Sequence, residues 1–151
     1  MPQASVKRLI KTEKKNLVDL VLDVDKYPSF IPYCIDSKVY ERIDKGDNVF
    51  IIADLTIGKG IFKDTYKSDV RYNKKDDSIY VTNIDGPLKY LENRWDFKQK
   101  ENVTEVCFKV DFELKNKFLN ILMTRSFNYG LNKIADAFQK RAEDLFVNTQ
   151  N

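Results

Sequence analysis

Alternation of apolar and polar side chains marks the middle of the chain. Between about residues 37 and 114 it recurs in six runs, which predict six antiparallel strands with one buried face. The clearest run, residues 106–114, places Val, Phe, Val, Phe and Leu at every second position. Residues 58–60 (Gly-Lys-Gly), the charged residues 73–77 and the Asp-Gly-Pro sequence at 85–87 predict turns between strands.

Other patterns flank this region on both sides. Residues 4–10 alternate and predict a first strand, and residues 13–23 repeat apolar positions at helical spacing, with Thr12 as the expected N-cap. Apolar side chains recur in steps of three and four through residues 117–146, which predicts a long amphipathic helix. Inside that helix, Gly130 predicts a kink or a close backbone contact.

The order of these elements is typical of an α+β domain. We expect one domain over residues 1–151, with an ordered core of about 3–147, in which the terminal helix covers the apolar face of the sheet. The space between them is either a packed core or an apolar ligand pocket, and periodicity does not separate the two. The inward aromatic side chains expected from alternation are Phe62, Tyr66, Trp95, Phe97, Phe108, Phe112, Phe118, Phe127 and Phe138.

The amino-acid composition excludes several kinds of catalytic and metal site. The chain has no histidine, which excludes imidazole zinc sites, Ser-His-Asp triads and Cys-His pairs. Its 26 basic and 23 acidic side chains leave a net charge of +3, too small a surplus to indicate a nucleic-acid-binding surface. Cys34 and Cys107 lack CxxC spacing, so we expect packed, inert thiols in a reducing compartment. Without a secretory signal or an apolar run of roughly 20 residues, the sequence predicts a soluble, cytoplasmic protein.

Catalytic signals are weak, and nothing in the sequence demands an enzyme. Asp76 and Asp77 are adjacent and would point apart. Asp54 and Asp64 flank the first predicted turn and could face each other across a hairpin, but without histidine or a metal cluster we do not expect a catalytic dyad. Arg125, on an otherwise apolar part of the long helix, either reaches inward to a ligand head group or extends to solvent.

Three ordered motifs carry a family resemblance. They are Tyr-Pro-Ser-Phe-Ile-Pro-Tyr-Cys at 27–34, Asp-Gly-Pro-Leu-Lys-Tyr-Leu at 85–91 followed by Arg-Trp-Asp-Phe at 94–97, and Val-Asp-Phe-Glu-Leu at 110–114, leading into the helix with residues 137–142. On these motifs, and over nearly the whole chain, the sequence resembles the coenzyme Q-binding and RatA-like branch of the START-domain superfamily. Many members of that superfamily carry a polyketide cyclase-like label.

The resemblance implies the helix-grip fold. In this fold a curved seven-stranded antiparallel sheet surrounds the long C-terminal helix, two short helices follow the first strand, and a hydrophobic tunnel lies between sheet and helix. Two departures from the family pattern affect the expected mouth of the tunnel. Leu88 stands where phenylalanine is usual, and Asn93 with Arg94 replaces a glycine-containing pair before Trp95.

The resemblance also implies a function. We expect binding of a hydrophobic ligand, an isoprenoid quinone such as coenzyme Q, by a carrier or chaperone that supports respiratory electron transfer and needs no cofactor besides that quinone. Such a carrier would contact the inner face of the membrane peripherally, and DNA is not an expected partner. The alternative is a RatA-type toxin that binds the large ribosomal subunit and blocks subunit association. A third and more distant hypothesis is an aromatase/cyclase.

The expected ligand contacts come from these motifs and from the positions expected to face inward. Phe30 and Ile31 would form a lid that plugs the tunnel or touches the membrane, or Phe30 would simply pack under the first helix. A quinone ring would stack on Trp95 or Tyr33, and its carbonyls would accept from Tyr66 or from the arginine of the long helix. The expected ligand-binding residues are Tyr27, Phe30, Ile31, Tyr33, Phe62, Tyr66, Leu88, Leu91, Trp95, Phe108, Phe112, Phe127 and Leu131.

The ribosome alternative needs a basic surface. Lysines on exposed strand faces and at strand tips would supply it, but Asp64, Asp69, Asp76 and Asp77 are interleaved with them, which favours a solvated face of mixed charge. The lysines are Lys7, Lys14, Lys15, Lys59, Lys63, Lys67, Lys74 and Lys75.

Overall fold

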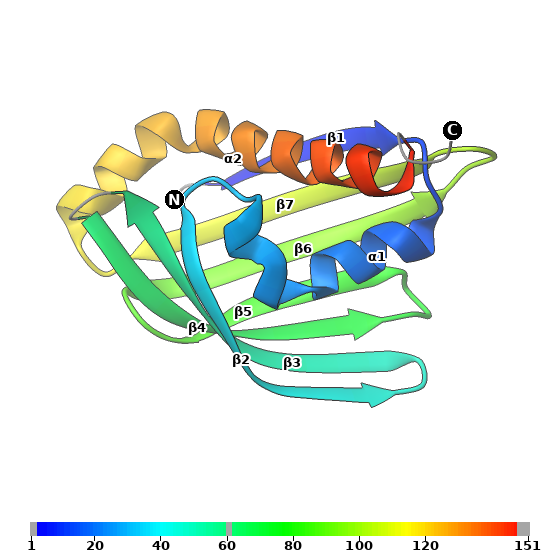
Figure 1. Ribbon diagram of the computed structural model, residues 1–151. Coiled ribbons are helices and arrows are strands. Elements are labelled where there is room, and N and C mark those ends of the chain that lie inside the picture. Colours follow the sequence, from blue (N-terminus) through cyan, green and yellow to red (C-terminus); the bar gives the residue numbers. More distant parts are fainter. Residues whose placement is uncertain (1–2, 60–61, 148–151) are drawn as a thin grey trace.

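A curved, seven-stranded antiparallel sheet lies against one long helix (Figure 1). The computed structural model describes residues 3–59 and 62–147, apart from the side chains of residues 59, 62, 119 and 122–126. The strand order is β1-β7-β6-β5-β4-β3-β2, so β1 and β2 are the edges of the sheet. The elements are β1 (Gln3–Ile10), α1 (Lys14–Leu22), the 3₁₀ helix η1 (Val24–Ser29), β2 (Cys34–Lys45), β3 (Asn48–Lys59), β4 (Phe62–Asn73), β5 (Ser78–Asp85), β6 (Leu88–Gln99), β7 (Thr104–Leu114) and α2 (Lys117–Phe146).

The predicted fold class and order of elements are confirmed. The helix expected at 13–23 is α1, the prolines that follow it are compatible with the short helix η1, and the long helix expected at 117–146 is α2. All six strands expected after residue 37 form, the first of them starting slightly earlier, at Cys34. Gly60, which belongs to the first predicted turn, lies outside the described residues.

In β7 every second side chain is buried, as the alternating pattern predicts. Val106, Phe108, Val110 and Phe112 are all buried toward α2. Trp95 of β6 lies opposite Phe108 in the sheet register, and the two rings stack with centroids 4.0 Å apart. The apolar core therefore lies between the concave face of the sheet and the helices.

The edge strand β1, near the start of the chain, pairs with β7 and bonds to α2, near its end. It pairs with β7 from Gln3 opposite Asp111 to Ile10 opposite Thr104. The guanidinium group of Arg8 donates hydrogen bonds to α2, to the carboxylate of Asp136 at 2.9 Å and to Asn132 at 3.2 Å. The residues of α2 that are buried against the sheet follow steps of three and four: Leu131, Ala135, Phe138 and Ala142.

The prediction that Thr12 is the N-cap of α1 is wrong. Glu13 holds that position and makes no side-chain capping bond. The Thr12 hydroxyl instead accepts a hydrogen bond from the Asn16 amide at 2.9 Å, and the Thr12 carbonyl accepts one from the hydroxyl of Thr104 at 2.8 Å. Thr12 thus ties the start of α1 to β7, and its partner lies 92 positions away in the sequence, beyond the reach of a local capping rule.

The start of α2 is not covered by the sheet. Phe118, which alternation placed inward, is 68% exposed, and Ile121 is 58% exposed. That prediction is wrong because β7 stops at Leu114, and the first turns of α2 lie at the end of the sheet (Figure 1). Of the two alternatives expected at Gly130, the close contact is not formed, since a Cβ atom there would meet no described atom within 4 Å, and the kink stays a prediction.

Candidate functional site

Aromatic rings from three parts of the chain meet between the sheet and α2. Tyr27 of η1 and Phe30, which follows η1, lie edge-on to Phe138 of α2, with ring centroids 5.5 and 5.3 Å away. Trp95 contacts Phe138 at 4.9 Å and stacks on Phe108. We call these five residues the aromatic cluster. Four of them were expected as ligand contacts, and Phe138 was expected only to face inward.

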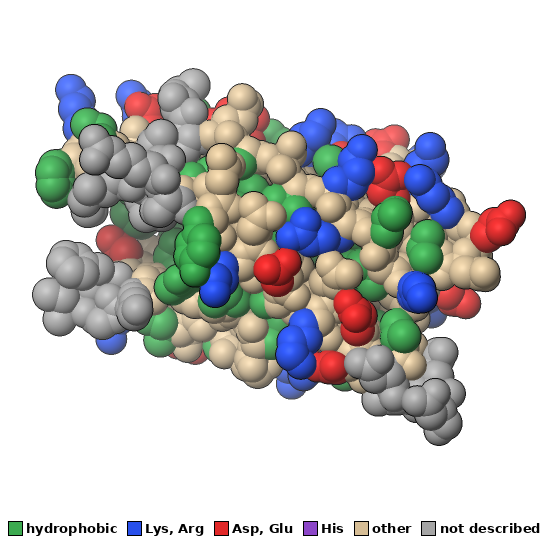
Figure 2. All heavy atoms as spheres, turned by 90° about the horizontal axis from the view of Figure 1, so that it is seen from above, with side chains coloured by type: hydrophobic (Ala, Val, Ile, Leu, Met, Phe, Trp, Pro, Cys, Tyr) green, Lys and Arg blue, Asp and Glu red, His purple; other side chains and the backbone are tan. Residues whose placement is uncertain are grey.

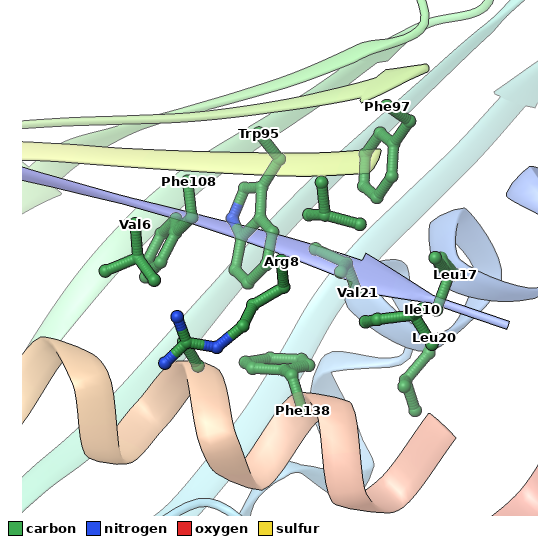
Figure 3. A pocket seen from close by; sticks show the side chains of 12 residues that line it. Val6, Arg8, Ile10, Leu17, Leu20, Val21, Trp95, Phe97, Phe108 and Phe138 are labelled. Atoms are coloured by element: carbon green, nitrogen blue, oxygen red, sulfur yellow. The ribbon is translucent and has the colours of Figure 1, made fainter. Parts of the chain in front are cut away.

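A small apolar cavity adjoins the aromatic cluster (Figure 3). Its volume is about 20 Å³, room for about one water molecule. Trp95, Phe108 and Phe138 lie around it, and Leu17 and Leu20 of α1 lie at its other end (Figure 3). At this end of the molecule the side chains fill the inner space, as a packed core would. The sequence-based list of contacts missed α1, although the apolar spacing of its residues is the signal that could have included it.

Part of the remaining inner space is lined by side chains that are only half-buried. Five residues that face it from β3, β4, β6 and α2 keep partial exposure to solvent, and we call them the open inner face. Four of them are apolar or aromatic and pack against the core. The sheet and α2 do not fully cover these side chains, so burying them under an apolar ligand would be favourable. The residues of the open inner face are Leu55, Tyr66, Asn93, Phe127 and Ile134.

Three ionisable groups beside this space stay protonated at neutral pH. Burial raises the pKa of the Tyr27 hydroxyl, which donates a hydrogen bond to the backbone oxygen of Val21. Burial also raises the pKa of Tyr66, and it raises the pKa of the Cys34 thiol to about 11. The charge of an ionised Cys34 would raise the pKa of both tyrosines, so the three groups are neighbours. They are neutral groups rather than a nucleophile or a base, and Tyr27 and Cys34 already donate to backbone oxygens of the protein.

A row of polar side chains crosses the inner face of β4, β5 and β6. Ser68 is fully buried, and its hydroxyl donates to a backbone oxygen of β3 at 3.2 Å. The amide of Asn83 bonds two backbone groups of β6, at 2.8 and 3.2 Å. Asn93 differs, because its Oδ1 atom is buried and has no hydrogen-bond partner among the described residues. The row therefore contains one acceptor that the fold itself does not satisfy.

The remaining expected ligand contacts fall into three groups. Tyr33 is 46% exposed and stands before β2 with a left-handed backbone, φ 69°. The side chains of Phe62 and Arg125 lie outside the described residues. The others are buried or half-buried toward the inner space: Ile31, Leu88, Leu91, Phe112, Phe127 and Leu131.

Asp54 and Asp64, which flank the first turn, do not form a carboxylate pair. In the register of β3 with β4, Asp54 lies opposite Lys67, and Asp64 lies opposite Ile57. Asp54 instead accepts a hydrogen bond from the hydroxyl of Tyr40 at 2.6 Å. The two aspartates do not face each other, because the strands pair in a register that sets them three positions apart.

Comparison with known proteins confirms the family resemblance. The chain is 29% identical over 141 residues to ribosome association toxin RatA of Rickettsia prowazekii, covering 91% of this chain and 94% of that protein. It is 32% identical over 140 residues to the mitochondrial coenzyme Q-binding protein COQ10 of Dictyostelium discoideum, covering 91% of this chain and 67% of that one. A START superfamily protein of Mycobacterium smegmatis shares the fold, with a TM-score of 0.79 at 17% identity over 95% of this chain and 98% of that one.

The family model that matches spans most of the chain. It covers residues 16–139, from α1 through the aromatic cluster to the buried part of α2. Both enzymes and lipid carriers are included in its description, so the match establishes the scaffold and its apolar inner space rather than a reaction. The chain belongs to the polyketide cyclase / dehydrase and lipid transport family.

Proposed function

We propose that the protein binds an isoprenoid quinone between the sheet and α2 and carries it in support of respiratory electron transfer. The open inner face supports this most directly, because it keeps aromatic and aliphatic side chains partly exposed inside a lipid-transport fold. A polyprenyl tail gains about 25 cal/mol for each Å² of apolar surface removed from water. One relative is named for coenzyme Q binding, and that name is what singles out a quinone among apolar ligands.

The polar groups beside the site suit an uncharged ring. Tyr66 is protonated and half-buried, so its hydroxyl can donate a hydrogen bond to a quinone carbonyl without burying a charge. The raised pKa values of Tyr27 and Cys34 keep those groups neutral as well. None of these three groups supplies a charge that could pair with an anionic head group.

Loading requires the aromatic cluster to open. The cavity of about 20 Å³ is far smaller than the roughly 300 Å³ or more of a small-molecule site. Tyr27 and Phe30 hold η1 and the residues after it against Phe138 by edge-to-face contacts. Displacing these two rings would join the cavity to the open inner face. This segment therefore acts as the lid of the site.

The test is the lipid content of the purified protein. We expect an organic extract of protein prepared without detergent from a quinone-producing host to contain a near-stoichiometric isoprenoid quinone by mass spectrometry. A soluble protein of similar size from the same host serves as the control for carry-over. Protein that is free of quinone, and that stays free after mixing with quinone-containing vesicles, would contradict the proposal.

We further propose that the start of α2 touches the membrane that supplies the ligand. Phe118 and Ile121 are exposed one turn apart, and the exposed Lys115 and Lys117 stand beside them. Apolar side chains flanked by lysines are typical of segments that lie in the interface of an anionic bilayer. No helix in the described part of the chain is long and apolar enough to cross a membrane.

Binding to the large ribosomal subunit is the second candidate, and the name of a relative favours it. Several cations of the described residues, however, are already paired with carboxylates, which leaves fewer of them for phosphates. Figure 2 shows basic and acidic side chains interspersed on the face that α2 presents. Cosedimentation with large ribosomal subunits that weakens steeply as salt rises would favour this function. The ion pairs are Lys7–Glu105, Lys14–Asp77, Arg71–Asp69, Lys89–Glu113, Arg94–Asp96 and Lys100–Glu105.

A further inference from the structure

We infer that Arg141 of α2 is a binding site for the phosphate of an anionic phospholipid, and that occupying this site opens the lid. The inference rests on the proposed function only in taking η1 and the residues after it as the lid. It adds a recognition step to that function, because the lid would open at a membrane that contains acidic lipids and stay closed in bulk solution.

Arg141 lies where α2 holds the lid closed. Its guanidinium is 5.4 Å from the centre of the Phe30 ring, and Phe138, about one turn earlier on α2, lies edge-on to the same ring with centroids 5.3 Å apart. Phe138 in turn contacts Trp95 in the aromatic cluster (Figure 3). The ring of Phe30 is therefore held by one apolar and one charged side chain of α2, and an anion would draw the charged one away from the ring.

The charge of Arg141 is not paired with a carboxylate in the described part of the chain. Its Nε atom is buried and makes no hydrogen bond there. The four other arginines whose side chains the structure describes each have a carboxylate oxygen within 3.2 Å. A buried N–H without an acceptor costs stability, and an anion from outside the protein would remove that cost. The four paired arginines are Arg8, Arg42, Arg71 and Arg94.

The guanidinium group of Arg141 can bind only an acceptor. Every nitrogen of an arginine side chain donates and none accepts, so its polarity does not depend on which way the group is turned. Nε is buried and unpartnered, while the residue as a whole is half-buried, so the terminal NH₂ groups are the part that solvent reaches. These two groups match two oxygens of a phosphate, and such charge-assisted pairs are stronger than contact with an aromatic ring.

The apolar side chains near Arg141 favour a phospholipid over free phosphate. Phe30 and Ile31 of the lid are half-buried, and Leu145, about one turn beyond Arg141 on α2, is 40% exposed. The site therefore combines a cation with apolar surface that water still reaches. A phospholipid supplies both a phosphate and acyl chains, whereas inorganic phosphate has nothing with which to cover the apolar side chains.

Trp95 provides the measurement, since it is the single tryptophan of the chain and packs against Phe138 behind the lid. Its fluorescence is quenched with acrylamide in the presence of phosphatidylglycerol vesicles, phosphatidylcholine vesicles, or inorganic phosphate at the same phosphate concentration. We expect phosphatidylglycerol to make Trp95 more accessible to acrylamide, because the lid opens. We expect the other two to leave it as it is in buffer.

The variants assign this response to Arg141. Arg141→Gln should need at least about 5-fold more phosphatidylglycerol for the same quenching, which is the effect of one basic residue at an anionic surface. Arg141→Lys keeps the charge without the planar fork and should fall in between. Arg71→Gln is the matched control, because Arg71 also lies over an aromatic ring, that of Phe50, but is already paired with Asp69. Its response should equal that of the unmodified protein.

Three results would overturn the inference: an unchanged response in Arg141→Gln, an equal loss in Arg71→Gln, or an equal response to inorganic phosphate or phosphatidylcholine. The last would show that the site does not select an anionic phospholipid. No quinone is used in this experiment, so each of these results leaves quinone binding intact. Conversely, a protein that never takes up quinone but keeps the Arg141-dependent response to phosphatidylglycerol would contradict the carrier function and support the anion site.

Discussion

At the scale of single residues, the motif at 85–87 is explained by close packing. Gly86 has a backbone φ of 132°, and a Cβ atom there would lie 2.7 Å from Cβ of Tyr66 and 2.8 Å from its Cα. Only glycine allows the turn between β5 and β6 to pass this close to β4. The glycine therefore helps to place Tyr66, one of the polar groups of the site.

Replacing this glycine tests that explanation. Gly86→Ala should lower the free energy of unfolding by about 3 kcal/mol, because both the backbone strain and the contact with Tyr66 oppose the new methyl group. Gly46→Ala is the matched control, since Gly46 has φ 62° with open space around it, and it should cost about 1 kcal/mol. Urea denaturation measures both values. Equal losses would mean that backbone strain alone explains the requirement for glycine.

The thiol of Cys34 gives a second prediction at this scale. Burial raises its pKa to about 11 from 9.0, so at pH 8 the reactive thiolate is about 100-fold scarcer than in an unperturbed thiol. In a Cys107→Ser variant, iodoacetamide should label the folded protein about 100-fold more slowly than the urea-unfolded protein, with a rate that still rises between pH 8 and 10. Labelling of the folded protein at the unfolded rate would show that the thiol is not shielded.

At the scale of elements, η1 and the residues that follow it are the part of the site that must move. Phe30 contacts Tyr27 and Phe138 edge-on, and the guanidinium of Arg141 lies 5.4 Å from the centre of its ring. Ile31 is half-buried beside it. These contacts are few and partly exposed, which suits a segment that opens at modest cost.

The lid is tested by a double substitution, Phe30→Ser with Ile31→Ser. We expect the quinone recovered from the purified protein to fall at least fivefold, while the free energy of unfolding falls by about 2 kcal/mol because both side chains are only half-buried. Ile35→Ser, at an exposed position of β2, is the control and should change neither quantity appreciably. A variant that unfolds in proportion to its loss of quinone would support simple packing of Phe30 instead.

The first turns of α2 are tested on vesicles. Phe118→Ser with Ile121→Ser should weaken cosedimentation with phosphatidylglycerol vesicles by at least about 10-fold, because two large apolar side chains no longer enter the interface. Leu9→Ser with Tyr80→Ser removes two exposed apolar side chains elsewhere and should leave binding unchanged. Equal effects of the two double variants would refute a specific role for α2.

At the scale of the whole molecule, periodicity predicted the architecture far better than it predicted the site. The strands and α2 follow from alternation and helical spacing, since β3 to β7 and much of α2 bury one face. The same rule failed at Phe118, because periodicity states which side a residue faces and not where the opposing layer ends. Periodicity also did not identify α1 as a wall of the cavity, or Asn93 as a residue with an unsatisfied acceptor. Both depend on which residues of distant segments meet.

The pairing of β1 with β7 sets the timing of folding. Residues 3–10 are made before their partners, residues 104–111, which follow about one hundred residues later, roughly 5–20 seconds at ordinary rates of synthesis. Throughout that interval one future edge of the sheet has no neighbour, and its apolar face has no helix to cover it. A nascent chain interrupted before α2 is complete would therefore expose the inner aromatic surface to aggregation, and holdase chaperones would have their longest opportunity to bind it.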